Sequence, residues 1–143
     1  TVTDILNRTK FPPEYLCMEL TERCKNMDIE FLKSELDFFR KLGIKIAIDD
    51  FGTGNATLNL LTELPIDELK VDMSFVRGIQ ESKPNQVLVQ AVVSCANQLG
   101  YKSCIEGVED KALFEYLHRY GSTYYQGYHF SKPVTLDEFK KLL

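Results

Sequence analysis

The sequence has little of the two residue types that hold most zinc sites in proteins, since it contains two histidines and four cysteines. It has no Cys-x-x-Cys pair, and no zinc-like spacing joins the cysteines to the histidines. The cysteines and histidines therefore do not predict a zinc site. We expect all four cysteines to be reduced thiols in a cytoplasmic protein: Cys17, Cys24, Cys95 and Cys104.

An excess of positive charge is also absent, because the formal net charge is −4. Bulk electrostatics therefore do not favour duplex nucleic acid as a partner. No run approaches the roughly 20 apolar residues of a membrane span, and no signal peptide opens the sequence. We expect no membrane contact from this chain, although a longer parent protein could be tethered to a membrane through other domains.

Linkers, repeats and low-complexity segments are missing, so the 143 residues are expected to form one domain. Strand-like and helix-like segments alternate without a hairpin signal, which predicts an α/β fold of five parallel β-α units. The predicted strands are Tyr15–Glu19, Ile44–Asp49, Leu69–Asp72, Lys102–Glu106 and Thr123–Gln126.

Helix boundary signals support this division of the chain. Asp28 is a predicted N-cap, and Gly43 and Gly100 end predicted helices. Thr135 and Glu138 form a predicted capping box for the last helix.

Two architectures fit five such units: an open doubly wound sheet and part of a TIM-type (β/α) barrel. No glycine-rich dinucleotide loop follows the first strand, which disfavours the Rossmann type of doubly wound sheet. A closed barrel needs roughly 200 residues or more. The sequence therefore predicts an incomplete barrel if it is of the barrel type.

Polar residues mark the end of every predicted strand. The carboxyl ends of parallel strands form the active-site edge in such folds, so these residues are candidates for one common site. They are, in strand order, Glu19 with Glu22, Asp49 with Asp50, Lys70 with Asp72, Glu106 with Glu109, and Gln126.

The second strand is the most informative, since it ends in two adjacent carboxylates followed by a glycine turn, Phe51-Gly52-Thr53-Gly54. Adjacent like charges cost energy unless a cation or hydrogen bonds compensate them. Hard oxygen ligands suit Mg²⁺ or Mn²⁺, and clustered carboxylates can hold two such ions for a phosphoryl displacement. With Lys70 to neutralise phosphate or orient water, the residues indicate a metal-dependent hydrolase of a phosphate ester.

Five segments in order carry a resemblance to a known family: Pro13–Glu22, Asp49–Gly54, Leu69–Asp72 with Ser74–Val76, Ile105–Glu109, and Gln126–Tyr128 with Phe130–Pro133. The chain resembles the EAL-domain cyclic di-GMP phosphodiesterases, and this covers it almost end to end. The resemblance implies a barrel fold and hydrolysis of cyclic di-GMP to linear pGpG with Mg²⁺ or Mn²⁺.

The resemblance also implies roles for individual residues. Glu19, Asp49, Asp50 and Glu106 would be metal ligands, with Asp49 bridging two ions. Lys70 would contact the attacking water or the phosphate, and Asp72 and Glu106 would complete the catalytic group. The supporting residues would be Glu109 and Gln126, together with Glu22, which would brace the loop from Asp49 to Gly54, a loop that in this family couples metal binding to dimerisation.

Two departures from the family pattern affect these expectations. The amino-terminal part of the family domain, with its Glu-Ala-Leu signature, is absent, so residues 1–143 are expected to be the carboxy-terminal portion of a single EAL domain. The loop continues as Asn55-Ala56-Thr57, where the family usually has an aromatic residue and two serines.

These departures predict little or no phosphodiesterase activity for the chain alone, and self-association through an exposed apolar barrel face. The alternative function is a non-catalytic regulatory module that binds cyclic di-GMP or a protein partner.

Overall fold

A computed structural model of the chain describes residues 1–21, 28–53 and 58–142. The described part contains one five-stranded sheet in the order β1-β2-β3-β4-β5, with every neighbouring pair parallel. This confirms the predicted α/β fold of five parallel units. The strands are β1 (Cys17–Leu20), β2 (Lys45–Phe51), β3 (Glu68–Val71), β4 (Lys102–Ile105) and β5 (Tyr124–Tyr125).

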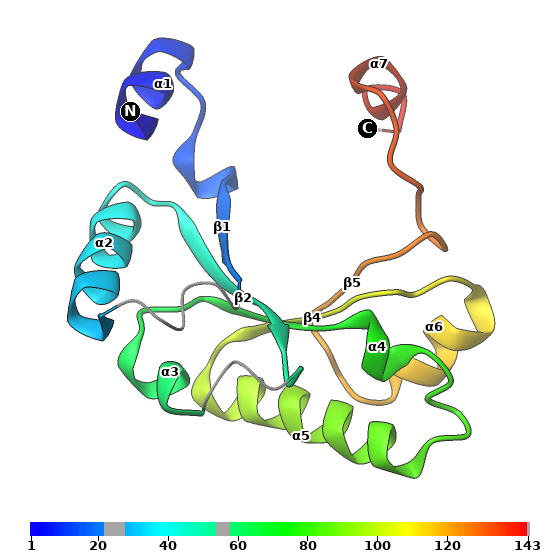
Figure 1. The fold of residues 1–143 in the computed structure, drawn as a ribbon. Coiled ribbons are helices and arrows are strands. Elements are labelled where there is room, and N and C mark those ends of the chain that lie inside the picture. The colour runs from blue at the N-terminus through cyan, green and yellow to red at the C-terminus, as the bar shows by residue number, and fades with distance from the viewer. Residues whose placement is uncertain (22–27, 54–57, 143) are drawn as a thin grey trace.

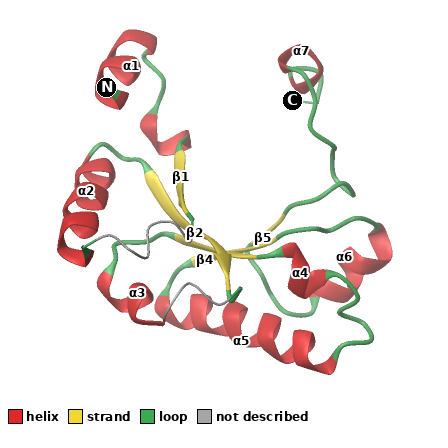
Figure 2. Ribbon diagram, in the orientation of Figure 1, coloured by secondary structure: helices red, strands yellow, loops and turns green. Residues whose placement is uncertain are grey.

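Helices connect successive strands and gather on one side of the sheet (Figure 1). A sequential strand order with helices on one side is the arrangement of a TIM-type barrel, whereas a doubly wound sheet has helices on both faces. Figure 2 shows the strands as a curved layer that does not close. The helices are α1 (Val2–Thr9), η1 (Pro13–Tyr15), α2 (Ile29–Lys41), α3 (Leu58–Glu63), α4 (Met73–Val76), α5 (Lys83–Leu99), α6 (Lys111–His118) and α7 (Leu136–Phe139).

The predicted helix boundaries have the expected local chemistry. The Asp28 carboxylate accepts a hydrogen bond from the backbone N–H of Phe31 at 2.9 Å, and Thr135 and Glu138 form a complete capping box. Gly100 ends α5 in the left-handed conformation. The single turn α4 was not predicted; it begins where Asp72 caps the backbone N–H of Ser74 at 2.9 Å.

The hydrophobic core lies between the sheet and its helices. One cluster joins β2 and β3 to α2 and α3, with Ile46, Ile48 and Leu69 fully or almost fully buried. A second joins β3 and β4 to α5 and α6, with Val71 and Ile105 at its centre. Burial on this side fixes the register, because a slip of one residue would turn these side chains to the opposite face.

The other face of the sheet is polar, which corrects the expectation of an apolar barrel face. Side chains in a strand point alternately to opposite faces, so the residues that alternate with the core positions lie on this open face. Most of these open-face residues in β1 to β4 are charged, and so is Glu106, which directly follows β4. The charged residues are Glu19, Lys45, Asp49, Glu68, Lys70, Lys102 and Glu106. The exposed face therefore favours water or a charged ligand over an apolar partner.

Exposed apolar side chains are found on α2 and α5 and at the two ends of the chain instead. Helices α1 and α7 extend from the side of the sheet opposite α5 (Figure 1) and expose Val2, Ile5, Leu136 and Phe139. Within the described residues, β1 and β5 each have a single strand neighbour and form the two sheet edges. No helix in this described part is both long and apolar enough to cross a membrane.

Candidate functional site

The ammonium group of Lys70 lies at the centre of a carboxylate cluster on the open face of the sheet. Its Nζ is 2.7 Å from Glu19 Oε1, 2.8 Å from Glu106 Oε1 and 3.3 Å from Asp49 Oδ1. Only 8% of the Lys70 side chain is exposed. Residues on or directly after four strands, β1 to β4, thus meet at one point, although they are separated by up to 87 positions between Glu19 and Glu106.

The strand register explains why these side chains meet. Glu19 is paired with Ala47 in β2, and Lys70 is paired with Cys104 in β4, two residues before Glu106. Each charged residue lies near the carboxyl end of its strand and on the face opposite the core. The structure therefore brings these strand-end residues together, as the sequence predicted.

A β-bulge places the two adjacent aspartates. Ile48 pairs with Leu69 and Phe51 pairs with Val71, so β2 advances three residues where β3 advances two. The extra residue falls at Asp49 and Asp50, and Asp50 has φ of 53°, in the left-handed region. In a regular strand these neighbouring side chains would point to opposite faces, whereas the bulge brings both carboxylates to the cluster.

The alternation of the sequence held a signal for this bulge that the sequence prediction missed. Ile46 and Ile48 face the core, so a regular strand would place Asp50 in the core and Phe51 on the polar face. Phe51 is instead 5% exposed and packs in the core. Phe51 thus faces the core although regular alternation from Ile48 would turn it to the polar face. This pattern indicates one extra residue in the strand between Ile48 and Phe51.

Three carboxylates could share one cation. Asp49, Asp50 and Glu106 each offer an oxygen, and these oxygens lie within 4.8 Å of one another. Asp49 Oδ1 is buried and makes no hydrogen bond, since Lys70 Nζ at 3.3 Å forms an ion pair without hydrogen-bond geometry. A buried carboxylate oxygen without a donor is costly, and a hard divalent cation such as Mg²⁺ or Mn²⁺ is a suitable partner for this donor set. The residues present therefore fit a divalent metal ion.

The cluster disfavours the charged form of Asp50 and favours the charged form of Lys70. Burial raises the pKa of Asp50, and the negative charges of Asp49 and Asp72 raise it further. For Lys70, burial lowers the pKa, but hydrogen bonds to Glu106 and Glu19 outweigh that effect and hold the pKa well above its ordinary value. Lys70 is therefore fully charged at neutral pH and balances part of the negative cluster.

Asp72 lies next to the cluster and is also the N-cap of α4. Burial raises its pKa, but hydrogen bonds from Ser74 outweigh this and lower the pKa below its ordinary value. Its carboxylate therefore stays ionised while it caps α4 and faces Asp50.

The loop after the bulge is closed by short hydrogen bonds. Thr53 donates from its backbone N–H and from its Oγ1 to the Asp50 carbonyl, at 3.2 Å and 2.9 Å. Gly52 has φ of 100°, which favours glycine. Gly54, the last residue of the predicted loop motif, lies outside the described residues.

Two of the predicted supporting residues, Glu109 and Gln126, line hollows other than the carboxylate cluster. Glu109 is exposed and lines a separate hollow of about 270 Å³ beside Arg77. Gln126 is exposed and lines a hollow of about 570 Å³ with Tyr128 and Lys132. Glu22 lies outside the described residues.

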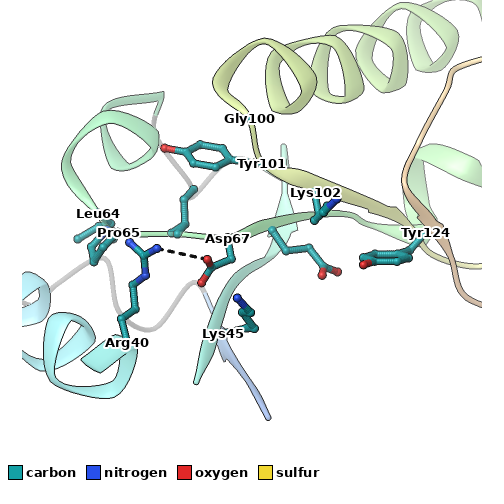
Figure 3. Close-up of a pocket in the computed structure, with 11 residues that line it drawn as sticks. Arg40, Lys45, Leu64, Pro65, Asp67, Gly100, Tyr101, Lys102 and Tyr124 are labelled. Carbon is teal, nitrogen blue, oxygen red and sulfur yellow. Dashed lines mark hydrogen bonds and ion pairs between the residues drawn. The ribbon is translucent and has the colours of Figure 1, made fainter. Parts of the chain in front are cut away.

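A further hollow, of about 460 Å³, opens at the amino ends of the strands, away from the cluster (Figure 3). Arg40 reaches across it to Asp67, with Nη2 3.4 Å from Oδ1. Asp67 also accepts a hydrogen bond from the backbone N–H of Ile46 at 2.9 Å. This acid therefore stabilises the entry into β2 and β3, and the candidate site is at the other end of the sheet.

The charge balance at Asp50 leads to a prediction. The fold raises the pKa of this carboxyl, so the ionised form is disfavoured and destabilises the fold above the ordinary carboxyl pKa. Asp50→Asn removes the charge, and asparagine tolerates the left-handed backbone. Without divalent ions at neutral pH, we expect Tm to rise by roughly 3 °C, and we expect Mn²⁺ binding to weaken.

Thermal unfolding in a chelator and Mn²⁺ calorimetry measure the two effects. Glu35→Gln, on the exposed side of α2, removes the same charge away from the cluster and is expected to change neither quantity. A lower Tm for Asp50→Asn than for Glu35→Gln would contradict the repulsion described for Asp50.

The fold and the site together define an α/β protein of the TIM type with a cluster of carboxylates at the carboxyl ends of its strands that fits a cation. The EAL domain pattern matches residues 1–133. The chain belongs to the EAL domain family, as its sequence motifs predicted.

Individual relatives agree with this assignment. The chain is 36% identical over 129 residues to the cyclic di-GMP phosphodiesterase NbdA of Pseudomonas aeruginosa, which is 90% of this chain and 16% of that protein. The EAL domain of Mycobacterium smegmatis DcpA has a similar structure, with a TM-score of 0.92 and 37% identity over 99% of this chain and 64% of that one. Klebsiella pneumoniae BlrP1, solved with manganese and cyclic di-GMP, gives a TM-score of 0.84 at 36% identity, covering 92% of this chain and 34% of that one.

Proposed function

We propose that the chain carries the carboxylate cluster of a divalent-metal-dependent phosphodiesterase domain that converts cyclic di-GMP to linear pGpG. The observation that carries the proposal is the group of oxygens from Asp49, Asp50 and Glu106 within 4.8 Å of one another, beside the Lys70 ammonium. The substrate class comes from relatives that are named cyclic di-GMP phosphodiesterases and from BlrP1, solved with this dinucleotide and manganese.

The residues divide into ligands and charge-balancing groups. Asp49, Asp50 and Glu106, together with Glu19, would hold Mg²⁺ or Mn²⁺. Bound ions would lower the pKa of the attacking water and offset the charge that builds up on the phosphate. The orphaned Oδ1 of Asp49 supports this role, since it is the one buried carboxylate oxygen of the described residues without a hydrogen-bond donor.

Lys70 acts by its charge rather than by proton transfer. Its raised pKa leaves no free amine to accept a proton at neutral pH. We assign Lys70 to contact the attacking water or the phosphate, and we assign Glu106 as the candidate base or metal ligand. Water would add to phosphorus and give a proton to a carboxylate. The bond from phosphorus to the 3′ oxygen would break, and this oxygen would take up a proton to leave the 3′ hydroxyl of pGpG.

The remaining predicted residues would support this group. Asp72 would keep its negative charge beside Asp50 and hold α4 in place. Glu109 and Gln126 would complete the rim, Glu22 would brace the loop after β2, and Phe51 would anchor that loop in the core.

The chain alone is expected to bind Mn²⁺ and to give no detectable pGpG. An octahedral ion has six ligand positions, and the three gathered carboxylates fill only part of them, so water must fill the rest. An ion held loosely is placed poorly, and small misplacements can cost about 100-fold in rate. Calorimetry with cyclic di-GMP, with and without Mg²⁺ or Mn²⁺, and chromatography of the reaction products measure binding and turnover.

Asp49→Asn is the matched variant, because it keeps the side-chain volume and removes the charge of a proposed metal ligand. Ion-dependent binding that is lost in Asp49→Asn supports the phosphodiesterase site. Dinucleotide binding that needs no ion would favour the non-catalytic regulatory module, and a chain that binds neither Mn²⁺ nor the dinucleotide would contradict the proposal.

The chain spans 18% and 16% of the length of two of the curated relatives that it matches, so their complete activities are not transferred to it. Self-association remains a prediction; the unpaired outer edges of β1 and β5 are the surfaces we propose for it. We also propose a cytoplasmic location, where cyclic di-GMP signalling enzymes would meet their substrate.

A further inference from the structure

The one-turn helix α4 lies between two loops that follow the strands of the carboxylate cluster. Gly52, after β2, approaches it so closely that an added Cβ would lie 3.1 Å and 3.3 Å from two ring carbons of Phe75. Gly107, after β4, is closer still, since its Cβ would lie 2.6 Å from the Cβ of Met73. The backbones of both loops therefore pack directly on α4.

The proposed ligands lie shortly before these two glycines, at the carboxyl ends of β2 and β4. Asp49 and Asp50 precede Gly52, and Glu106 directly precedes Gly107. The strands β2 and β4 are not neighbours, because β3 lies between them, so their backbones are separated by about two strand spacings, roughly 10 Å. Helix α4 follows β3 and therefore lies between the two loops. It can determine the distance between them.

Phe75 can hold that distance because it is itself anchored. It is half-buried and packs against the core cluster that includes Val71, Val76 and Val108. Its ring faces the loop at Gly52, whose φ of 100° allows the backbone to approach without a side chain. A smaller side chain at position 75 would leave a gap behind the loop that carries the bulge.

We propose that Phe75 is a positioning residue for the cation site, and that it sets the place of Asp49 and Asp50 relative to Glu106 through its contact with Gly52. This inference rests on the proposed function, since it requires the carboxylates to bind a divalent ion. Phe75 would touch neither the ion nor the substrate, and it acts through the loop backbone.

The test is Mn²⁺ affinity, measured by calorimetry on the whole chain. Phe75→Leu removes the ring and leaves every ligand oxygen in the sequence, and we expect it to weaken Mn²⁺ binding about 10-fold, as the loss of groups that orient ligands does. Phe75→Tyr keeps the ring and is expected to retain the affinity of the unmodified chain. If Phe75→Leu does not fold, Phe75→Met also removes the ring and is expected to weaken Mn²⁺ binding in the same way.

Val89→Ala is the matched control, because Val89 is buried in α5 within the same core cluster as the residues around Phe75. It is expected to lower the urea midpoint about as much as Phe75→Leu and to leave Mn²⁺ affinity unchanged. Equal losses of affinity in both variants, or unchanged affinity in Phe75→Leu, would overturn the positioning role alone. An unmodified chain that does not bind Mn²⁺ overturns the proposed function as well, and that result is seen before any variant is made.

Discussion

Lys70→Met is expected to lower the free energy of unfolding by about 3 kcal/mol in the absence of divalent ions. The substitution keeps much of the side-chain length and removes the ammonium that pairs with three carboxylates, at 2.7 Å, 2.8 Å and 3.3 Å. Asp49 and Glu106 would then be left as partly buried charges that no cationic side chain of the described residues balances. Glu19, 46% exposed, can turn to water, which keeps the cost near the lower end of the range for a broken buried pair.

The pH range of this effect follows from the direction of the Lys70 shift. Its pKa in the fold lies above its ordinary value of 10.5, so its contribution to stability is complete below that value. It is lost only as the pH rises through the higher pKa of the fold. Measurements near neutral pH therefore report the whole contribution of Lys70.

Urea denaturation with a chelator and with Mn²⁺ tests this prediction. We expect Mn²⁺ to stabilise Lys70→Met more than the unmodified chain, because the ion replaces the missing positive charge. Lys45→Met is the control, since Lys45 is an exposed lysine on the same face of the sheet. Equal urea midpoints for the two variants would show that Lys70 does not balance the cluster.

The order of the elements could be predicted because each boundary has its own local chemistry. Asp28 caps α2, Gly100 ends α5, and the Thr135–Glu138 pair caps α7, all as the sequence indicated. Helical crossovers between short apolar runs leave few alternatives to parallel pairing. The polarity of the open face was predicted wrongly, because we assigned apolar character to both faces of the strands although residues such as Lys45 and Glu68 alternate with the core.

The site could be predicted only as far as strand ends determine it. Parallel pairing was enough to bring Glu19, Lys70 and Glu106 together. The bulge at Asp49 and Asp50 could have been predicted from the position of Phe51, whereas the contact of Gly52 with Phe75 depends on tertiary packing and follows from no pattern in one segment. The position of Lys70 at the centre of the cluster likewise needed the register of β3 between its two neighbours.

Gly127→Ala is the second large effect, with an expected loss of at least about 3 kcal/mol of unfolding free energy. An added Cβ at this position would overlap the backbone nitrogen and the carbonyl oxygen of Val108, and it would lie 2.6 Å from the carbonyl carbon. Overlap with backbone atoms cannot be relieved by rotating a side chain. The segment cannot shift freely either, because Val108 donates to the Gln126 carbonyl at 3.0 Å and accepts from His129 at 2.9 Å.

Gly121→Ala separates this steric effect from backbone conformation. Gly121 has φ of 71° with open space around its added Cβ, so its substitution carries only the left-handed penalty of about 1 kcal/mol. We expect urea denaturation to give a loss for Gly127→Ala at least twice that for Gly121→Ala. In Gly127→Ala, the segment after Gln126 would separate from Val108. The packing of Phe130 against Phe114, whose ring centroids are 5.5 Å apart, would then also be lost. Equal losses would mean that the segment after β5 moves aside at little cost, and that its contact with Val108 does not hold the carboxyl-terminal part of the chain to the sheet.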